Sequence, residues 1–272
     1  MKRLLPALFL LSFSAAVCAE NELEIQASNF FRDLKAASPN LSERLKQDPV
    51  LWDKMISAAI PGMIPAEKQK PTAPKEKAPL YPARLIAQNT IFYARLDRID
   101  EESLQKLMAE MRITARIANR PVGAILDLRS ADNGDFDSVA RFVALFTPQP
   151  EKKMHFFQKI PLAILCGKKT NGPAELLTIL LERSRLGISL GKTGAGNSLP
   201  RKETIINGRK WLVPELPDFA KDVPLGKHTP MIECTAYPQI PFEQIGKMPI
   251  ESDPAIRRST DLLRSLHAIR GK

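Results

Sequence analysis

Residues 161–176, Pro-Leu-Ala-Ile-Leu-Cys-Gly-Lys-Lys-Thr-Asn-Gly-Pro-Ala-Glu-Leu, decide the fold because they pass directly from one kind of secondary structure into another. The first six residues are apolar without interruption, as in a strand that is buried on both faces. After a polar turn, Pro173 begins a helix that the spacing of apolar residues extends to Leu186. A buried strand followed by an amphipathic helix is the repeating unit of a parallel α/β sheet.

The same unit recurs on both sides of this stretch. Apolar runs predict three further strands, over residues 91–96, 122–128 and 187–190. We expect one helix after the cap residue Asp100 and another over 139–146. The chain is therefore predicted to form a parallel-rich sheet with flanking helices.

The last part of the chain has a different pattern. Residues 203–213 predict a hairpin with its turn at Asn207-Gly208, and residues 231–234 predict a last strand. Asp253 and Pro254 begin a predicted C-terminal helix. This helix, within 247–272, is expected to pack on a core formed by residues 83–246.

The first nineteen residues have the features of an export signal. Two basic residues precede an apolar stretch, and Val17-Cys18-Ala19 ends it before Glu20. We expect cleavage near Ala19 and a periplasmic or secreted protein; lipidation at Cys18 is the alternative. No later stretch reaches the roughly 20 apolar residues of a transmembrane helix.

Two segments separate this signal from the core. Residues 20–60 space their apolar side chains as short amphipathic helices do, which predicts a small helical segment. Residues 61–82 are rich in proline and lysine, and this composition favours an extended linker.

The charge of the chain limits the classes of partner that it can bind, and its cysteines limit its possible disulfides. Cleavage removes Lys2 and Arg3, so the formal net charge falls from +10 to +8. The basic residues are dispersed, which argues against a nucleic-acid partner. Cys166 and Cys234 remain after cleavage and form either a disulfide or two buried thiols.

Four blocks, in order, resemble the family of tail-specific (C-terminal processing) serine peptidases. They are residues 123–134, 161–176, 191–197 and 253–259, and the resemblance covers about residues 83–268. It implies a crotonase-like α/β fold and a serine nucleophile that is activated by a lysine base.

The resemblance places the nucleophile at Gly172, followed by Pro173, Ala174 and the accessory glutamate Glu175. The base position, 25 residues after the nucleophile position, is Asn197. Glycine has no side chain to attack with, and an amide is not basic at neutral pH. The resemblance therefore implies a peptidase fold without its catalytic residues.

The same resemblance implies an incomplete oxyanion hole. One donor would be the backbone N–H of residue 173, but proline has none. The second donor would come from around Asn133 and Gly134. Glu175 is also explained without catalysis, because a glutamate in the first turn of a helix complements the helix dipole.

Other chemistries have weaker support. A two-residue shift would place the nucleophile at Thr170, with Lys168, Lys169 or Lys192 as the base. Ser198 is a further candidate nucleophile. The three histidines, His155, His228 and His267, lack the spacing of a metal site, so we expect no metal and no cofactor.

We therefore expect an exported pseudopeptidase that binds polypeptide or an envelope protein without cleaving it. One alternative is an active serine- or threonine-type endopeptidase with a displaced nucleophile. The other is a scaffold or assembly protein of the cell envelope. The sequence leaves the oligomeric state open.

Overall fold

The structure is a computed structural model that describes residues 32, 50, 53–54, 63–66, 83–117, 120–148, 156–206, 209–215, 217–220, 223, 227–234 and 252–270. The chain divides into two compact units. The first comprises Met1–Pro74 with Leu199–Gly226, and the second comprises Lys75–Ser198 with Lys227–Lys272.

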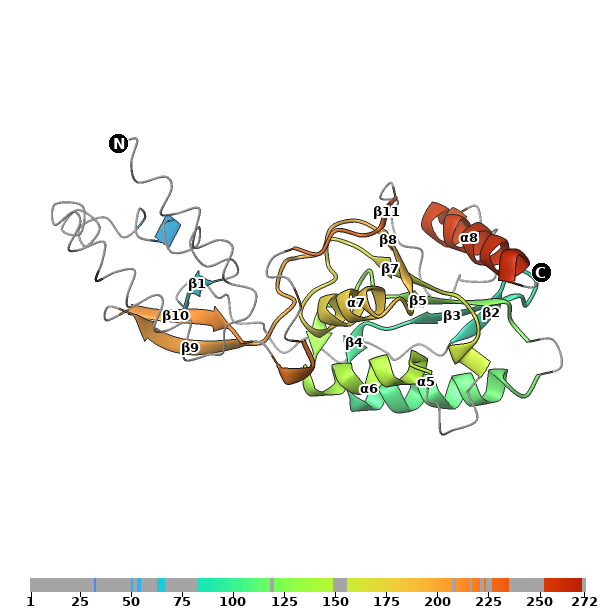
Figure 1. The fold of residues 1–272 in the computed structure, drawn as a ribbon, viewed down its shortest axis with the longest axis horizontal. Helices are drawn as coiled ribbons and strands as arrows, with labels where there is room; N and C mark the ends of the chain where they lie inside the picture. The colour runs from blue at the N-terminus through green and yellow to red at the C-terminus, as the bar shows by residue number, and fades with distance from the viewer. Residues whose placement is uncertain are drawn as a thin grey trace. The chain divides into compact units, whose positions relative to one another are not determined.

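A six-stranded sheet forms the centre of the second unit (Figure 1). Its strands, in spatial order, are β11 (Ile232–Glu233), β8 (Ile188–Gly191), β7 (Leu162–Cys166), β5 (Gly123–Asp127), β3 (Ile91–Arg95) and β2 (Arg84–Ile86). All neighbouring pairs are parallel except β2 and β3. The predicted α/β class with a mostly parallel sheet is confirmed.

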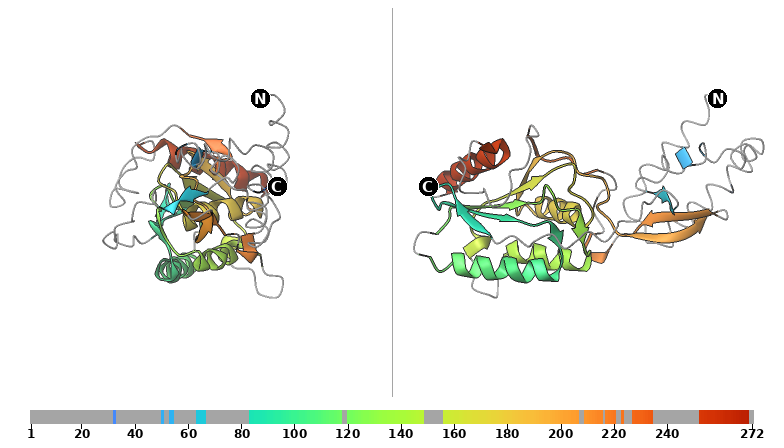
Figure 2. Two further views of the ribbon diagram at one scale, coloured as in Figure 1. Left: turned by 90° about the vertical axis from the view of Figure 1, so that its left-hand side faces the viewer. Right: turned by 180° about the vertical axis from the view of Figure 1, so that it is seen from behind.

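Helices cover both faces of this sheet. They are α5 (Glu101–Thr114), α6 (Asp137–Phe146), α7 (Pro173–Arg183) and α8 (Pro254–Arg270). Figures 1 and 2 show α5 and α6 against one face and α8 against the other. A short helix, η2 (Phe156–Gln158), precedes β7, and Phe157 packs edge-on against Phe92 of β3.

Local sequence explains most of these elements. Every residue of β3, β5 and β7 is buried, as their apolar runs predict. The Asp100 side chain accepts a hydrogen bond of 2.9 Å from the Ser103 N–H and so caps α5. Helix α7 ends at Arg183, earlier than expected, because Arg185 adopts a positive φ of 57°.

The first unit contains a three-stranded antiparallel sheet. Strand β10 (Arg209–Pro214) lies between β9 (Arg201–Ile206) and β1 (Ile64–Pro65), and Trp211 is fully buried. The β9–β10 pairing agrees with the predicted hairpin, whose turn at 207–208 lies outside the described residues.

Two sequence expectations differ from this arrangement. Residues 64–65 were expected in an extended linker but pair with β10, and Met63 beside them is 1% exposed. The hairpin was expected in the core, yet the structure groups it with the first unit. Both differences arise because strand pairing joins segments that are far apart in the sequence.

Most of the chain before residue 63 lies outside the described residues, including the predicted signal peptide. Residues 32, 50, 53 and 54 are described and are helical, within the predicted helical segment 20–60. In the part of the chain that the structure describes, no helix has the length and apolar character needed to cross a membrane.

Candidate functional site

Three loops converge where the parallel strands β5, β7 and β8 end. Strand β6 (Asn133–Gly134) follows β5 and pairs with β4 (Arg98–Ile99), helix α7 follows β7, and a turn over 192–198 follows β8. Ligands of open α/β sheets bind at the carboxyl ends of such strands. The positions that the resemblance selected therefore lie at the edge of the sheet where a site is expected.

Gly172 is the N-cap residue of α7 and has an unusual backbone. Its φ of 56° and ψ of −128° are unfavourable for residues with a Cβ. A Cβ at this position would nevertheless meet only Phe136 Cζ, at 3.9 Å. The position to which the resemblance assigns the nucleophile thus has room for a Cβ in ordinary van der Waals contact with Phe136, but it has no side chain.

The Glu175 carboxylate connects α7 to the turn that contains the base position. Glu175 is fully buried and accepts hydrogen bonds from the backbone N–H groups of Gly196, Asn197 and His228, at 2.9, 3.0 and 2.9 Å. Gly194 is required beside it, because a Cβ there would lie 2.5 Å from Glu175 Oε1. In this structure the accessory glutamate holds two loops in place.

The backbone N–H groups of Gly134 and Gly172 are already occupied. The Gly134 N–H donates to Asn133 Oδ1 at 2.9 Å, and the Gly172 N–H donates to Asn171 Oδ1 at 2.9 Å. Pro173, the first residue of α7, has no N–H. Neither N–H is therefore free to stabilise an oxyanion without displacing an asparagine side chain.

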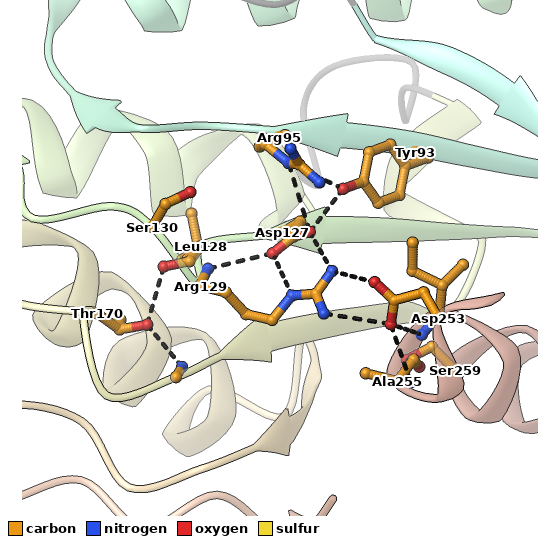
Figure 3. Close-up of polar contacts among 12 residues, drawn as sticks. Tyr93, Arg95, Asp127, Leu128, Arg129, Ser130, Thr170, Asp253, Ala255 and Ser259 are labelled. Carbon is orange, nitrogen blue, oxygen red and sulfur yellow. Dashed lines mark hydrogen bonds and ion pairs between the residues drawn. The ribbon is translucent and has the colours of Figure 1, made fainter. Parts of the chain in front are cut away.

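Thr170, the alternative nucleophile, is engaged in structural hydrogen bonds. Its hydroxyl donates to the Leu128 carbonyl at 2.8 Å and accepts from the Gly167 N–H at 2.8 Å, and the residue is 1% exposed (Figure 3). The bond to Leu128 joins the loop after β7 to the loop after β5, and the bond from Gly167 closes the turn within the β7 loop. Lys168 and Lys169 are exposed and Lys192 is half-buried, whereas Ser198 is buried.

A buried network of charged side chains supports the β5 end of the site (Figure 3). The Tyr93 hydroxyl donates to Asp127 Oδ2 at 2.5 Å, and Arg95 Nε donates to that hydroxyl at 3.2 Å. Arg129 binds Asp127 at 2.7 Å and Asp253 at 2.8 Å. Asp253 in turn accepts from the Ala255 N–H at the start of α8.

The network shifts the acidity of its members. Burial raises the pKa of Asp127, but Arg129, together with Arg95 and Tyr93, lowers it by more than burial raises it. The pKa is therefore about 2, below the ordinary value of 3.8. Burial and then Asp127 raise the pKa of Tyr93 well above its usual value. Sequence analysis missed this network, although Asp127 and Arg129 are charged residues at the end of an apolar run, which is a usable signal.

The two cysteines are free, buried thiols in this structure. Leu165 and Cys234 belong to the core cluster that packs against α8. Cys166 follows Leu165 in the strand, so its side chain points to the opposite face of the sheet. Burial, then Glu182 and Glu175, raise the pKa of the Cys166 thiol to about 12, so it is not reactive at neutral pH.

His228 was expected to be a surface or packing residue, and it is buried in a polar contact. Its Nε2 lies 2.6 Å from Glu182 Oε2. Among the described residues, no group of His, Cys, Asp or Glu is arranged to hold a metal ion.

Comparisons with protein-family models and with curated proteins each found no match. Comparison with solved structures found similar folds. The photosystem II D1 C-terminal processing protease is 16% identical over 66% of this chain and 51% of that one, with a TM-score of 0.44. The tricorn protease is 13% identical over 66% of this chain and 18% of that one, with a TM-score of 0.44. A lipoprotein from Streptococcus agalactiae is 13% identical over 67% of this chain and 69% of that one, with a TM-score of 0.43.

The chain spans about half the length of the D1 processing protease and a fifth or less of the tricorn protease. At these identities the likeness concerns the fold, and the chemistry must be argued from the residues of this chain. All three TM-scores lie below 0.5, so these comparisons report a partial likeness to solved structures that include a C-terminal processing protease and assign no role to this chain.

Proposed function

We propose that this protein is an exported pseudopeptidase that binds extended polypeptide at the loops around Gly172 and does not cleave it. The observation that carries the proposal is the state of Gly172. The position has room for a Cβ without a clash, no nucleophilic side chain, and a backbone N–H that Asn171 already occupies. On this proposal, a polypeptide segment lies against Gly172, which lacks the group that would attack it.

The remaining loop geometry supports binding. Glycine allows a ligand to approach the backbone closely, because no Cβ intervenes. Glu175 fixes the adjacent turn through several backbone N–H groups, so the surface beside Gly172 is held in one conformation before a ligand arrives. Preorganisation of this kind favours binding and requires no chemistry.

The alternative of a displaced nucleophile has less support. Thr170 would have to release the Leu128 carbonyl and the Gly167 N–H in order to attack a substrate. If the protein is a scaffold, residues 20–82 bind the partner and the loops around Gly172 bind no ligand. The two alternatives therefore predict different outcomes in one experiment.

The test uses the chain from Glu20 to Lys272 and a permanently unfolded probe, reduced and carboxymethylated lactalbumin. Binding is measured by fluorescence anisotropy, and cleavage of the same probe is followed by mass spectrometry. We expect saturable binding without cleavage. Gly172→Gln, which places a side chain where the proposed ligand would lie, should weaken binding about tenfold or more, whereas Lys168→Gln, an exposed change in the neighbouring loop, should have little effect.

Cleavage that Thr170→Ala or Ser198→Ala abolishes would show an active enzyme and overturn the proposal. Binding that Gly172→Gln leaves unchanged, but deletion of residues 20–82 removes, would favour the scaffold role.

A further inference from the structure

Residues 227–231, which we call the strap, lie against the turn that contains the base position. The Gly194 N–H donates to the His228 carbonyl at 3.0 Å, and the His228 N–H donates to Glu175 Oε1 at 2.9 Å. The Lys227 side chain passes over Gly196, because its Cγ would be only 2.6 Å from a Cβ placed there. The strap therefore covers part of this turn.

The side chains of Glu182 and Ser189 hold the strap through hydrogen bonds. His228 Nε2 contacts Glu182 Oε2 at 2.6 Å, with 7% and 14% of the two side chains exposed. The Met231 N–H donates to Ser189 Oγ at 2.9 Å, and the same hydroxyl donates to Glu182. Glu182 thus holds both ends of the strap, one directly and one through Ser189.

The acidity of Glu182 agrees with this role. Burial raises the pKa of its carboxyl, but the hydrogen bonds from His228 and Ser189 lower it overall. The carboxylate is therefore charged at neutral pH, and a hydrogen bond to a charged group is stronger than a neutral one.

The strap also has a particular place in the chain. The chain leaves the second unit after Ser198, immediately beyond the base-position turn, and returns to it at Lys227, the first residue of the strap. The segment Leu199–Gly226 of the first unit is thus joined covalently to the turn at one end and to the strap at the other.

We propose that the strap is a movable wall of the candidate site and that the Glu182–His228 contact is the fastener that keeps it closed. His228 is a positioning residue, which acts through its backbone on Glu175 and on the turn 194–197. Opening the strap uncovers this turn and removes one of the hydrogen bonds that hold Glu175. The inference rests on the proposed function for what the open site would bind, but its test does not require a ligand.

Amide hydrogen exchange of the full mature chain, resolved by NMR, tests the proposal. The amides of Gly194, His228 and Met231 report on the strap, and the amide of Leu128, which donates to the Leu165 carbonyl at 2.8 Å, reports on the central sheet. His228→Ala should accelerate exchange about tenfold at the strap amides and leave Leu128 unchanged, because a hydrogen bond to a charged group is lost. His228→Gln, which keeps a donor near the place of Nε2, should stay within about twofold of the unmodified chain.

Unchanged exchange at the strap amides in His228→Ala overturns the proposal. If His228→Ala also accelerates exchange at the Leu128 amide, that variant has destabilised the whole unit, and Glu182→Gln is used instead. Faster exchange of Glu182→Gln confined to the strap amides supports the proposal, and any other result contradicts it. The lactalbumin probe separates the two proposals. Faster strap exchange without any change in probe binding leaves the movable strap standing and counts against polypeptide binding at this site.

Discussion

Arg129 and Asp253, 124 residues apart in the chain, are joined by two hydrogen bonds of 2.8 and 3.2 Å that connect the end of β5 to the start of α8. Asp253 is 1% exposed and also accepts hydrogen bonds from the first backbone N–H groups of α8. One carboxylate thus pairs with a buried guanidinium and caps a helix.

Asp253→Ala should therefore lower the free energy of unfolding by about 3–5 kcal/mol, because it leaves Arg129 buried without one of its partners and removes the cap. Urea unfolding followed by circular dichroism measures the effect. The control is Asp261→Ala, an exposed position of α8, for which a change within about 0.5 kcal/mol is expected. Equal effects of the two changes would contradict the role of the network.

The lowered pKa of Asp127 predicts loss of stability in acid. Its pKa in the folded chain is about 2, below the ordinary value of 3.8, so its stabilising contribution is fully present above pH 3.8 and is lost as the pH falls toward 2. The expected loss is on the order of 2 kcal/mol. Unfolding by urea at pH 5.0, 4.0, 3.0 and 2.5 should show it, and the same series on Asp127→Asn should be flatter. Parallel pH profiles for the two proteins would refute the assignment.

Substitutions at Thr170 distinguish a structural hydroxyl from a nucleophile. Thr170→Val keeps the shape but leaves the Leu128 carbonyl and the Gly167 N–H without this partner, which should cost about 2 kcal/mol of stability. Thr170→Ser keeps the hydroxyl and should cost less than about 1 kcal/mol. The unfolding experiment is accompanied by the lactalbumin cleavage assay, in which a structural Thr170 predicts no difference among the three proteins.

Two glycines with positive φ should respond differently to the same change. Gly172→Ala meets only an ordinary contact with Phe136, so mainly its backbone conformation is penalised, by about 1–3 kcal/mol. Gly134→Ala would place its Cβ 2.2 Å from the Ile99 carbonyl oxygen, and the clash adds to the strain, for a total above about 3 kcal/mol. Thermal unfolding compares the variants; a smaller loss at Gly134 than at Gly172 would show that the β4–β6 pairing is described wrongly.

Glu175→Gln tests the carboxylate that holds the base-position turn. The amide replaces one acceptor oxygen with an NH2 group that faces backbone donors, so about 2–3 kcal/mol of stability should be lost. Exchange at the Gly196 and Asn197 amides should rise by more than about tenfold. The matched change Glu102→Gln on the exposed side of α5 should alter neither quantity. Protection of both amides that survives in Glu175→Gln would exclude this role for the carboxylate.

The sequence alone determined the central parallel strands and the helices of the core, and the absence of a side chain at position 172. The local spacing of apolar residues predicts buried strands and amphipathic helices. The runs at 91–96, 122–128 and 161–166 therefore predict β3, β5 and β7 closely. A missing side chain is likewise a property of one residue, and no tertiary contact can supply it.

Only the tertiary structure decided what the polar residues do. The Arg129–Asp253 and Glu182–His228 contacts join residues 124 and 46 positions apart, and hydrophobic periodicity carries no information about such pairs. The same reason explains why Ile64–Pro65 was assigned to a linker and yet pairs with β10. Composition and periodicity report on neighbouring residues in the sequence. A buried charge, in contrast, is stable only where the fold brings its partner within hydrogen-bond distance, and that partner can lie far away in the sequence.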